Sequence, residues 1–319
     1  MILAVDIGGT TCKLGIFDLS LKQIAKWQIP TETGREGRDI LPAVHAAFKN
    51  KTGELGLEPL DFTGVGIGVP GPVEFESGTV NGAINLNWHT HKNVKEEFES
   101  LSGRPVIVDN DANLATLGEQ AFGAGRGCKD VVMFTLGTGV GGGIITDHHL
   151  VHGANGSAGE IGHIKVAVEE GFICNCGGAG CLETVASTLG LKNMARKYHS
   201  EFKDSPLRQY IENDTLNALT VFKNAEKEDP LSLFLVERMA FYLGIGISNV
   251  TVMTNPSHIL LGGGLSQAGE TLRGRVQTYF EEYAFPPAAE GVEIFLAELG
   301  NDAGIYGAAK IVSQYIGRA

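Results

Sequence analysis

The sequence predicts an α/β protein with two domains, on three observations. The chain has 319 residues, which exceeds what one hydrophobic core usually supports. Short apolar runs that end at glycine turns alternate with longer amphipathic stretches, as strands alternate with helices in α/β folds. An apolar run followed by a glycine turn with a hydroxyl and a second β-prone run occurs at the start of the chain and again after Arg126. This repetition suggests an internal duplication into two related halves.

Composition and charge exclude several classes of protein. The apolar fraction of 43% and the charged fraction of 19% are those of an ordinary soluble globular protein. A net charge of −12 argues against a nucleic-acid-binding surface and against binding to an anionic membrane. The first residues lack the basic region of a signal peptide, and no uninterrupted apolar run approaches the length of a membrane-spanning helix. We therefore expect a cytoplasmic protein with neither nucleic acid nor membrane as partner.

The first half opens with a predicted hairpin, in which β-prone runs at residues 2–5, 14–18 and 23–29 are joined by turns. A P-loop or a Rossmann fingerprint would lead from a strand into a helix, so neither motif is present. A glycine turn with hydroxyls can still offer backbone N–H groups to a phosphate, and Asp6 is placed to hold a magnesium ion through water. The residues expected at this phosphate turn are Asp6, Gly8, Gly9, Thr10, Thr11 and Lys13.

The rest of the first half alternates predicted helices with predicted strands. Apolar periodicity indicates the helices, and continuous apolar runs indicate buried strands. The predicted elements are a helix at 37–50, a strand at 65–69 that runs into the rigid turn 70–73, a polar loop at 81–88, a helix at 94–101, a strand at 105–108 and a helix at 114–122.

The polar run at residues 109–113 is a candidate for chemistry. It stands where a predicted strand ends and a helix begins, which is where α/β proteins place their active groups. Position alone leaves two roles open for Asp111. It could act as a general base, or it could cap the following helix, a role that Asp109, Asn110 or Asn113 could serve equally well.

The second half repeats the opening pattern with strands at 131–136 and 140–146 around the turn Gly137, Thr138 and Gly139. Two such turns favour the hypothesis that both hold the phosphates of one nucleotide. The remaining predicted elements are helices at 182–198, 215–227, 231–253, 272–282 and 305–315, the last capped by residues 301–304, and strands at 259–261 and 292–296. The first of these two strands runs into a third glycine turn with Gly263 and Gly264, and Gly244 and Gly246 predict close helix packing.

One imidazole and three thiols, His163, Cys174, Cys176 and Cys181, fall within nineteen residues. Three sulfur ligands and one histidine suit a tetrahedral structural zinc ion, closed to substrate. A disulfide pair or buried free thiols are the alternatives. Glu160 and Glu183 flank the ligands, so a loop closed around zinc would bring both acids and the imidazole to one rim that could bind a polyol. Cys12 and Cys128 lie outside this cluster and are expected to be small buried apolar residues.

With these residues in view, the chain resembles the bacterial ROK family of sugar kinases, and within it the glucokinases. The resemblance covers the chain from end to end, and its most specific part is the histidine and cysteine signature. The matching segments are residues 6–10, 70–73, 110–113, 136–143, 162–183, 262–264 and 300–304. The resemblance implies an actin-like, hexokinase-type fold, with an N-terminal domain of residues 1–117 joined by 301–319, a C-terminal domain of residues 118–300, and an ATP cleft.

The resemblance also implies residue roles. Asp111 would be the catalytic base, and His163 would be both a zinc ligand and a sugar contact. ATP and Mg²⁺ would bind at the glycine turns, and Zn²⁺ would be structural. The other expected sugar contacts are Asn110, Gly71, Asn85, Glu160 and Glu183; Asn85 lies in a loop, 85–88, that lacks the proline and glycine associated with the family's sugar loop.

The favoured activity is phosphorylation of the 6-hydroxyl of glucose by ATP, with glucose and ATP as small-molecule partners of a homodimer or homotetramer. Because the same polar residues can serve any hexose, a kinase for fructose, mannose or an N-acetylhexosamine is the first alternative, and polyphosphate could replace ATP. A sugar sensor without catalysis is another. The transcriptional repressors of the family need a helix-turn-helix ahead of the first hairpin, whereas this hairpin begins at Ile2.

Overall fold

The computed structural model describes residues 1–316 and divides the chain into two compact units. The first unit contains Met1–Gly127, Leu150–Gly159 and the chain from Asn301 onward, and the second contains Cys128–His149 and Glu160–Gly300. The predicted boundary after residue 117 would cut the helix α3, Asp111–Phe122, which lies wholly in the first unit. The chain returns to the first unit for residues Leu150–Gly159, and no pattern in the sequence predicted this return.

The first unit is built on a five-stranded sheet with the order β3-β2-β1-β4-β8. β1 pairs antiparallel with β2 and parallel with β4, and β4 pairs parallel with β8. The central strands are almost fully buried, whereas β3 alternates half-buried and exposed residues, as an edge strand does. The bounds are β1 Ile2–Ile7, β2 Thr11–Phe17, β3 Gln23–Pro30, β4 Gly64–Val69 and β8 Val106–Asn110.

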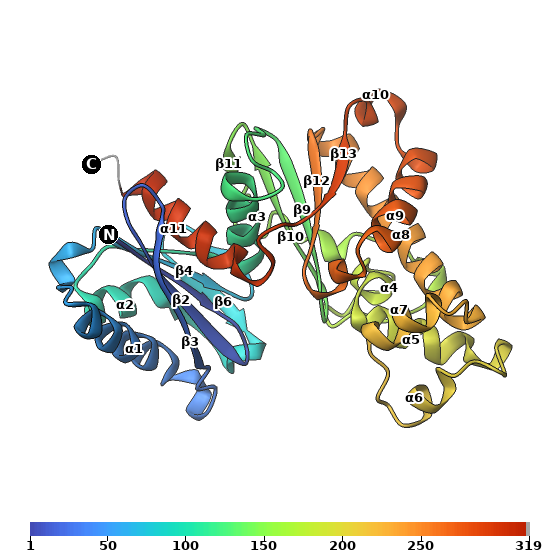
Figure 1. Ribbon diagram of the computed structural model, residues 1–319, viewed down its shortest axis with the longest axis horizontal. Helices are drawn as coiled ribbons and strands as arrows, with labels where there is room; N and C mark the ends of the chain where they lie inside the picture. The colour runs from blue at the N-terminus through green and yellow to red at the C-terminus, as the bar shows by residue number, and fades with distance from the viewer. Residues whose placement is uncertain (317–319) are drawn as a thin grey trace. The chain divides into compact units, whose positions relative to one another are not determined.

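Strand β4 alternates valine or isoleucine with glycine, and this alternation decides which helices cover each face. Val65, Ile67 and Val69 belong to the core shared with the helices α1, Ile40–Leu55, and α2, Val94–Ser102. The glycines point to the other face, where α11, Ala303–Tyr315, and α3 pack (Figure 1). A Cβ atom at Gly66 would lie only 2.1 Å from the Ala308 carbonyl oxygen. The backbone of α11 can lie this close to the sheet because the glycines of β4 carry no side chains on this face.

Helices α3 and α11 also approach each other through glycine. A Cβ atom at Gly307 would lie 1.7 Å from the Leu114 carbonyl oxygen, and one at Gly118 would lie 2.2 Å from the Ala303 carbonyl oxygen. The contact fixes α3, which begins at Asp111, against the C-terminal helix.

Gly307→Ala is expected to destabilise the protein by about 3 kcal/mol or to shift α11, because the added methyl group must displace a helix backbone. Gly53, in α1, is the matched control, since no atom lies within 4 Å of a Cβ placed there. Gly53→Ala should instead stabilise the protein by up to about 1 kcal/mol. Urea unfolding of both variants measures these effects, and equal midpoints for Gly307→Ala and the wild type would contradict the packing argument.

A small antiparallel sheet, β5-β6-β7, occupies the region predicted as a polar loop at 81–88. Its strands are β5 Val73–Glu74, β6 Thr79–Ala83 and β7 Trp88–Asn93. The loop prediction was therefore wrong for the ends of that range, and the 3₁₀ turn Ile84–Leu86 lies between two strands. Trp88 is 3% exposed and its indole N–H donates to the Gly37 carbonyl oxygen. Together with Val73, Val80 and Ala83 it joins this sheet to the core of the first unit.

The second unit has a five-stranded sheet with the order β11-β10-β9-β12-β13. β9 pairs antiparallel with β10 and parallel with β12, which pairs parallel with β13. These positions match β1, β2, β4 and β8 of the first sheet, so the duplication predicted from the glycine turns is present in the topology. The bounds are β9 Val131–Leu136, β10 Val140–Thr146, β11 His149–Leu150, β12 His258–Gly262 and β13 Glu293–Leu296.

The helices of the second unit share a core with its sheet. The helix predicted at 182–198 is broken at Ser187, whose hydroxyl caps the second part by accepting the Gly190 N–H. The close packing predicted at Gly244 is present, since a Cβ there would lie 2.5 Å from Tyr279 Cβ. The helices are α4 Glu183–Ala186, α5 Thr188–Tyr198, α6 Arg208–Glu212, α7 Ala218–Ala225, α8 Pro230–Thr254, α9 Glu270–Tyr283 and α10 Pro286–Ala289.

By length and composition alone, helix α8 could cross a membrane. The sequence analysis did not predict this. Of its most apolar window, 67% is buried inside the protein, as in the core helix of a globular domain.

The cap predicted at residues 301–304 is not formed by a side chain. Asp302 stands at the N-cap position of α11 but accepts no bond from the helix. Its carboxylate instead lies 2.6 Å from the Lys26 ammonium group on β3. The remaining short 3₁₀ segments are Arg35–Gly37, Pro59–Asp61, Ile161–His163, Val168–Glu170, His199–Glu201, Gly264–Ala268 and Gly300–Asp302.

Candidate functional site

In the first unit, polar residues meet where β8 ends and α3 begins. Asn110 is the N-cap of α3, and its side-chain oxygen accepts the N–H groups of Ala112 at 2.8 Å and Asn113 at 3.2 Å. Its side-chain nitrogen donates to the Gly71 carbonyl oxygen at 3.0 Å. Two predicted sugar contacts, Asn110 and Gly71, are thus joined directly.

Asp111 is the first residue of α3, and the capping role left open for it belongs to Asn110. One of its carboxylate oxygens accepts its neighbour's N–H, that of Ala112, at 2.8 Å. The N-terminus of a helix carries a partial positive charge, which favours the ionised form of a carboxylate placed there. Asp111 therefore offers a carboxylate at the start of α3, next to the cap residue Asn110.

Asp6 lies near the end of β1, at the predicted phosphate turn and beside the start of α11. A Cβ atom at Gly304 would lie 2.9 Å from one Asp6 carboxylate oxygen, and the Lys13 ammonium group lies 3.7 Å from that oxygen. Burial raises the pKa of Asp6, and the charge of Lys13 partly offsets this effect. A carboxylate destabilised by burial gains from a nearby hard cation, so Asp6 suits Mg²⁺.

The other predicted residues of this turn lie close by. The Gly8 N–H donates to the Thr11 carbonyl oxygen at 3.0 Å, and the Thr10 carbonyl oxygen accepts the Thr31 N–H. A Cβ atom at Gly9 would lie 3.2 Å from the carbonyl oxygen of Asn85, an exposed residue. The structure therefore brings Asn85 beside the first glycine turn.

In the second unit, Glu183 connects the second glycine turn to the cysteine cluster. One carboxylate oxygen accepts the Val140 N–H at 3.0 Å, and a Cβ atom at Gly139 would collide with that oxygen at 2.0 Å. The other oxygen lies 3.6 Å from Cys174 Sγ. Only glycine at position 139 leaves room for this carboxylate.

The second glycine turn also contacts the start of α5 and the third glycine turn. The carbonyl oxygens of Gly137 and Thr138 accept the N–H groups of Thr188 and Leu189. A Cβ atom at Gly263 would lie 2.4 Å from the Leu136 carbonyl oxygen, so the turn with Gly263 and Gly264 lies beside the end of β9.

His163, Cys174, Cys176 and Cys181 form a cluster in which one ligand atom of each lies within 4.8 Å of the others. The Sγ atoms of Cys176 and Cys181 are 3.6 Å apart, and Cys174 Sγ is 3.6 Å from His163 Nδ1. Zinc–sulfur bonds of about 2.3 Å in a tetrahedron place ligand atoms about 3.6–3.8 Å apart. The donor set and these separations fit zinc, and all five cysteines are free, so the disulfide alternative is not observed.

The two nitrogens of His163 face different groups. Nδ1 faces the cysteine cluster, and Nε2 lies 3.9 Å from a carboxylate oxygen of Glu160. Both side chains are 40% exposed. Glu160 and His163 therefore present a carboxylate and a ring nitrogen to solvent at the edge of the cluster.

Lys165 lies against the cluster, although nothing in the sequence pointed to it. Its ammonium group is 2.7 Å from Cys181 Sγ, and a bridge between the two backbones holds them side by side. Three thiolates and a neutral imidazole around a divalent ion leave one net negative charge. With zinc bound, Lys165 would supply the compensating positive charge.

A buried carboxylate anchors the loop between His163 and Cys174. Glu170 accepts hydrogen bonds from Lys197, Arg238, Tyr198 and Tyr242, and its side chain is 1% exposed. Burial by itself would raise the pKa of Glu170, but the bonds from Lys197 and Arg238 lower it to about 2. The loop is thus tied to helices α5 and α8.

Glu170→Gln is expected to lower the free energy of unfolding by about 2–3 kcal/mol at neutral pH. This is somewhat less than the loss of one partner of a fully buried ion pair costs, because Lys197 and Arg238 reach solvent. Because the folded pKa is lowered from 4.5 to about 2, the contribution of Glu170 is complete above pH 4.5 and is lost as the pH falls toward 2. Thermal unfolding is measured from pH 7 to pH 2. The difference in melting temperature between the variant and the wild type should disappear as the pH falls from 4.5 toward 2. Glu201→Gln, at an exposed residue, is the control, and a constant difference would contradict the assignment.

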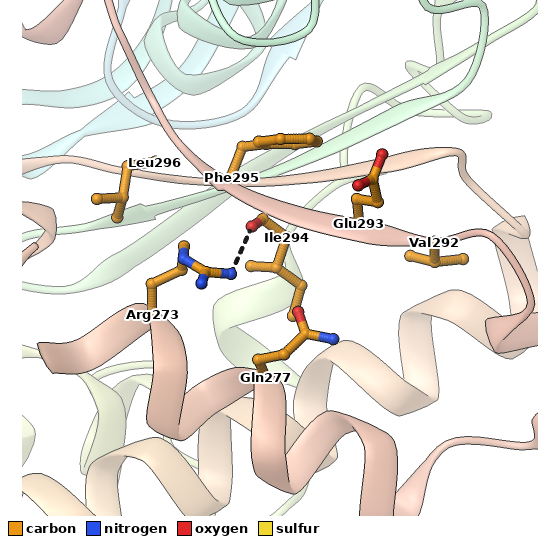
Figure 2. A pocket seen from close by; sticks show the side chains of 7 residues that line it. All are labelled: Arg273, Gln277, Val292, Glu293, Ile294, Phe295 and Leu296. Atoms are coloured by element: carbon orange, nitrogen blue, oxygen red, sulfur yellow. Dashed lines mark hydrogen bonds between the residues drawn. The ribbon is translucent and has the colours of Figure 1, made fainter. Parts of the chain in front are cut away.

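A cavity of about 450 Å³ lies between α9 and β13, away from all predicted site residues. Arg273 and Gln277 reach from α9 toward the strand, and Arg273 donates to the Ile294 carbonyl oxygen at 3.2 Å (Figure 2). Arg273 also pairs with Glu270 on its own helix, so its charge is already compensated.

The two five-stranded sheets have matching strand orders, and each begins with a glycine-turn hairpin. A cluster of one histidine and three cysteines lies in the second unit. These features define the class of the protein, which is an α/β protein of the actin-like, hexokinase-type fold. Comparison with known proteins then gives the family. The ROK family profile matches residues 2–315, so the chain belongs to the ROK family.

Named relatives are similar over almost their full length. The chain is 42% identical to a glucokinase of Halalkalibacterium halodurans, covering 98% of this chain and 94% of that protein. It is 33% identical to a glucokinase of Thermotoga maritima, covering 99% and 98% of the two chains. Among solved structures, a ROK family glucokinase from Streptomyces griseus, in complex with glucose and AMPPNP, has a TM-score of 0.80 and 33% identity over 98% of this chain and 99% of that one.

Proposed function

We propose that the protein is an ATP-dependent sugar kinase that transfers the γ-phosphoryl group of ATP to the 6-hydroxyl of glucose. The observation that carries this proposal is the 42% identity to a glucokinase along almost the whole of both chains. The complex of the Streptomyces griseus relative with glucose and AMPPNP supports the pair of substrates.

Asp111 is the proposed base. Phosphoryl transfer passes through a loose transition state, so the protein mainly aligns the acceptor oxygen and compensates charge. The carboxylate of Asp111 orients the primary hydroxyl of the sugar and accepts its proton as the new bond to phosphorus forms. Its place as the first residue of α3 holds the carboxylate next to the cap residue Asn110.

Asn110 can give the sugar one hydrogen bond from its side chain. Its oxygen is engaged by two backbone N–H groups, and one of its two amide hydrogens is engaged by Gly71. One N–H remains to donate to a sugar hydroxyl. Gly71 and Asn85 are proposed as further sugar contacts of the first unit.

Glu160, His163 and Glu183 are the proposed sugar contacts of the second unit. When bound, zinc would be held by His163, Cys174, Cys176 and Cys181 and would order the loop on which these residues stand. The second nitrogen of His163 then hydrogen-bonds a sugar hydroxyl, which makes the order of the cluster and the affinity for sugar interdependent.

The nucleotide phosphates are proposed to bind at the glycine turns. Gly8, Gly9, Thr10 and Thr11 of the first turn and Gly137, Thr138 and Gly139 of the second offer backbone N–H groups and hydroxyls. Gly263 and Gly264 complete the set from the third turn. Asp6 would hold Mg²⁺ through water, and Lys13 contributes positive charge near the phosphates.

A panel of hexoses with ATP and Mg²⁺, read by coupled detection of ADP, tests this proposal. Glucose should give the highest kcat/KM, with a smaller value for fructose, mannose and the N-acetylhexosamines. A higher value for one of those sugars would assign the kinase to it. Sugar binding without ADP release would make the protein a sensor, and turnover with polyphosphate would extend the range of donors.

The protein is expected to act in the cytoplasm and as a homodimer or homotetramer. Both statements stay predictions, supported by the family to which the chain belongs.

A further inference from the structure

We propose that Asp109 and His152 form a positioning pair that holds the turn carrying Asp111 and, with it, the segment that leads into Glu160. This inference rests on the proposed sugar kinase function. It gives His152, which no sequence pattern singled out, a role, and it gives Asp109 a role other than the helix cap considered for it from the sequence.

Asp109 is the buried centre of the pair. It is the residue before the N-cap of α3 and is 1% exposed. One of its oxygens accepts the Asn110 N–H at 2.7 Å and the side-chain N–H of Asn113 at 3.0 Å. The other lies 2.7 Å from His152 Nε2. A buried carboxylate is costly unless it is fully hydrogen-bonded, so His152 supplies the donor that the second oxygen requires.

The ring of His152 is held in place by aromatic contacts. Phe75, in the turn between β5 and β6, stacks on it with ring centroids 4.2 Å apart and an interplanar angle of 22°. Tyr315 of α11 packs edge-on against Phe75. His152 therefore has a fixed ring plane, with Nε2 directed at Asp109, and because the carboxylate accepts, that nitrogen carries the hydrogen.

The segment Leu150–Gly159 is attached to the first unit at a second point. A Cβ atom at Gly156 would lie 1.9 Å from the Val73 carbonyl oxygen, so the backbone of the segment lies directly on β5. The Ala158 N–H donates to the His152 carbonyl oxygen at 3.1 Å and closes the segment on itself. Glu160 follows immediately in the chain.

The pair therefore sets two proposed functional groups through short stretches of backbone. Asp109 is separated from Asp111 by the N-cap alone, and His152 begins the closed loop that ends before Glu160. Loss of the bond frees the start of α3, and a misplacement of about 1 Å at a reacting group can cost about 100-fold in rate. The expected effect falls on kcat, because Asp111 acts in the transition state.

Two substitutions separate the hydrogen bond from the bulk of the ring. In His152→Gln the amide nitrogen can take the place of Nε2, whereas in His152→Asn it takes the place of Nδ1 and does not reach Asp109. Both replace the ring that stacks on Phe75 with a primary amide, and they differ by the one methylene group that decides whether the amide reaches Asp109. His152→Ala completes the series.

We expect His152→Gln to keep kcat for glucose within about threefold of the wild type, and His152→Asn and His152→Ala to lose about tenfold or more, with a smaller change in KM for ATP. Melting temperatures are measured for all three, so that kcat is compared at a temperature where each variant is folded. Equal kcat for the glutamine and asparagine variants would overturn the positioning role.

The wild type is assayed in parallel, because the inference depends on the proposed function. A wild type that turns over no sugar with ATP rejects the kinase proposal and the positioning pair together. A wild type that turns over glucose, with three variants of equal kcat, rejects the pair alone.

Discussion

Asp111→Ala is expected to lower kcat for glucose phosphorylation by about 10³-fold or more, because general-base catalysis typically contributes 10²–10⁴-fold. The cost in stability should be small, about 1 kcal/mol, since Asn110 and not Asp111 caps α3. Steady-state kinetics with glucose and ATP, together with urea unfolding, measure both quantities. Glucose affinity should change far less than kcat.

Two further variants sharpen this prediction. Asp111→Asn keeps the size of the side chain and removes its basicity, so it should be nearly as slow as the alanine variant. Asp204→Ala removes an exposed carboxylate elsewhere and should leave the rate unchanged. An Asp111→Ala variant with a near-normal rate would show that another group accepts the proton.

Loss of the metal cluster is expected to have the second-largest effect. Cys176→Ala removes one of four ligands and should abolish stoichiometric zinc binding, as measured by elemental analysis of the purified protein. The melting temperature should fall by on the order of 10 °C, since a loss of about 3 kcal/mol shifts a domain of this size by roughly 2–4 °C per kcal/mol. Glucose affinity should fall about tenfold or more, because His163, which lies against Cys174 in the cluster, is also a proposed contact to the sugar.

Cys128→Ala provides the matched control, because this cysteine lies outside the cluster. It should bind zinc and glucose as the wild type does. Normal glucose affinity in metal-free protein would separate the cluster from sugar binding, even if the melting temperature fell. Metal binding should also release protons, since burial raises the pKa of the Cys174 thiol to about 12 and that proton must leave when zinc binds.

Local patterns in the sequence predicted the parts of the fold that depend on neighbouring residues. β1 and β4 are continuous apolar runs and were predicted as strands, and the cluster could be found because its ligands lie in one short stretch. The matching strand orders of the two sheets follow the repeat seen in the glycine turns. These features need no information about distant contacts.

The features that were missed depend on residues far apart in the chain or on a buried minority of side chains. The strand β7 was not predicted because its sequence is mostly polar, and Trp88 is the only one of its residues that is buried. His152 meets Asp109 across 43 positions, and Glu170 meets Arg238 across 68, with no local pattern that predicts either contact. The break at Ser187 could have been predicted, since serine is a favoured N-cap residue. It was missed because the helical spacing of apolar residues continues on both sides of Ser187.

The most direct test of the account is a crystal structure of the protein with glucose and a non-hydrolysable ATP analogue. We expect the 6-hydroxyl of glucose to lie within hydrogen-bonding distance of the Asp111 carboxylate, with the Asn110 amide donating one bond to the sugar. Glucose bound with its 6-hydroxyl remote from Asp111 would contradict the account.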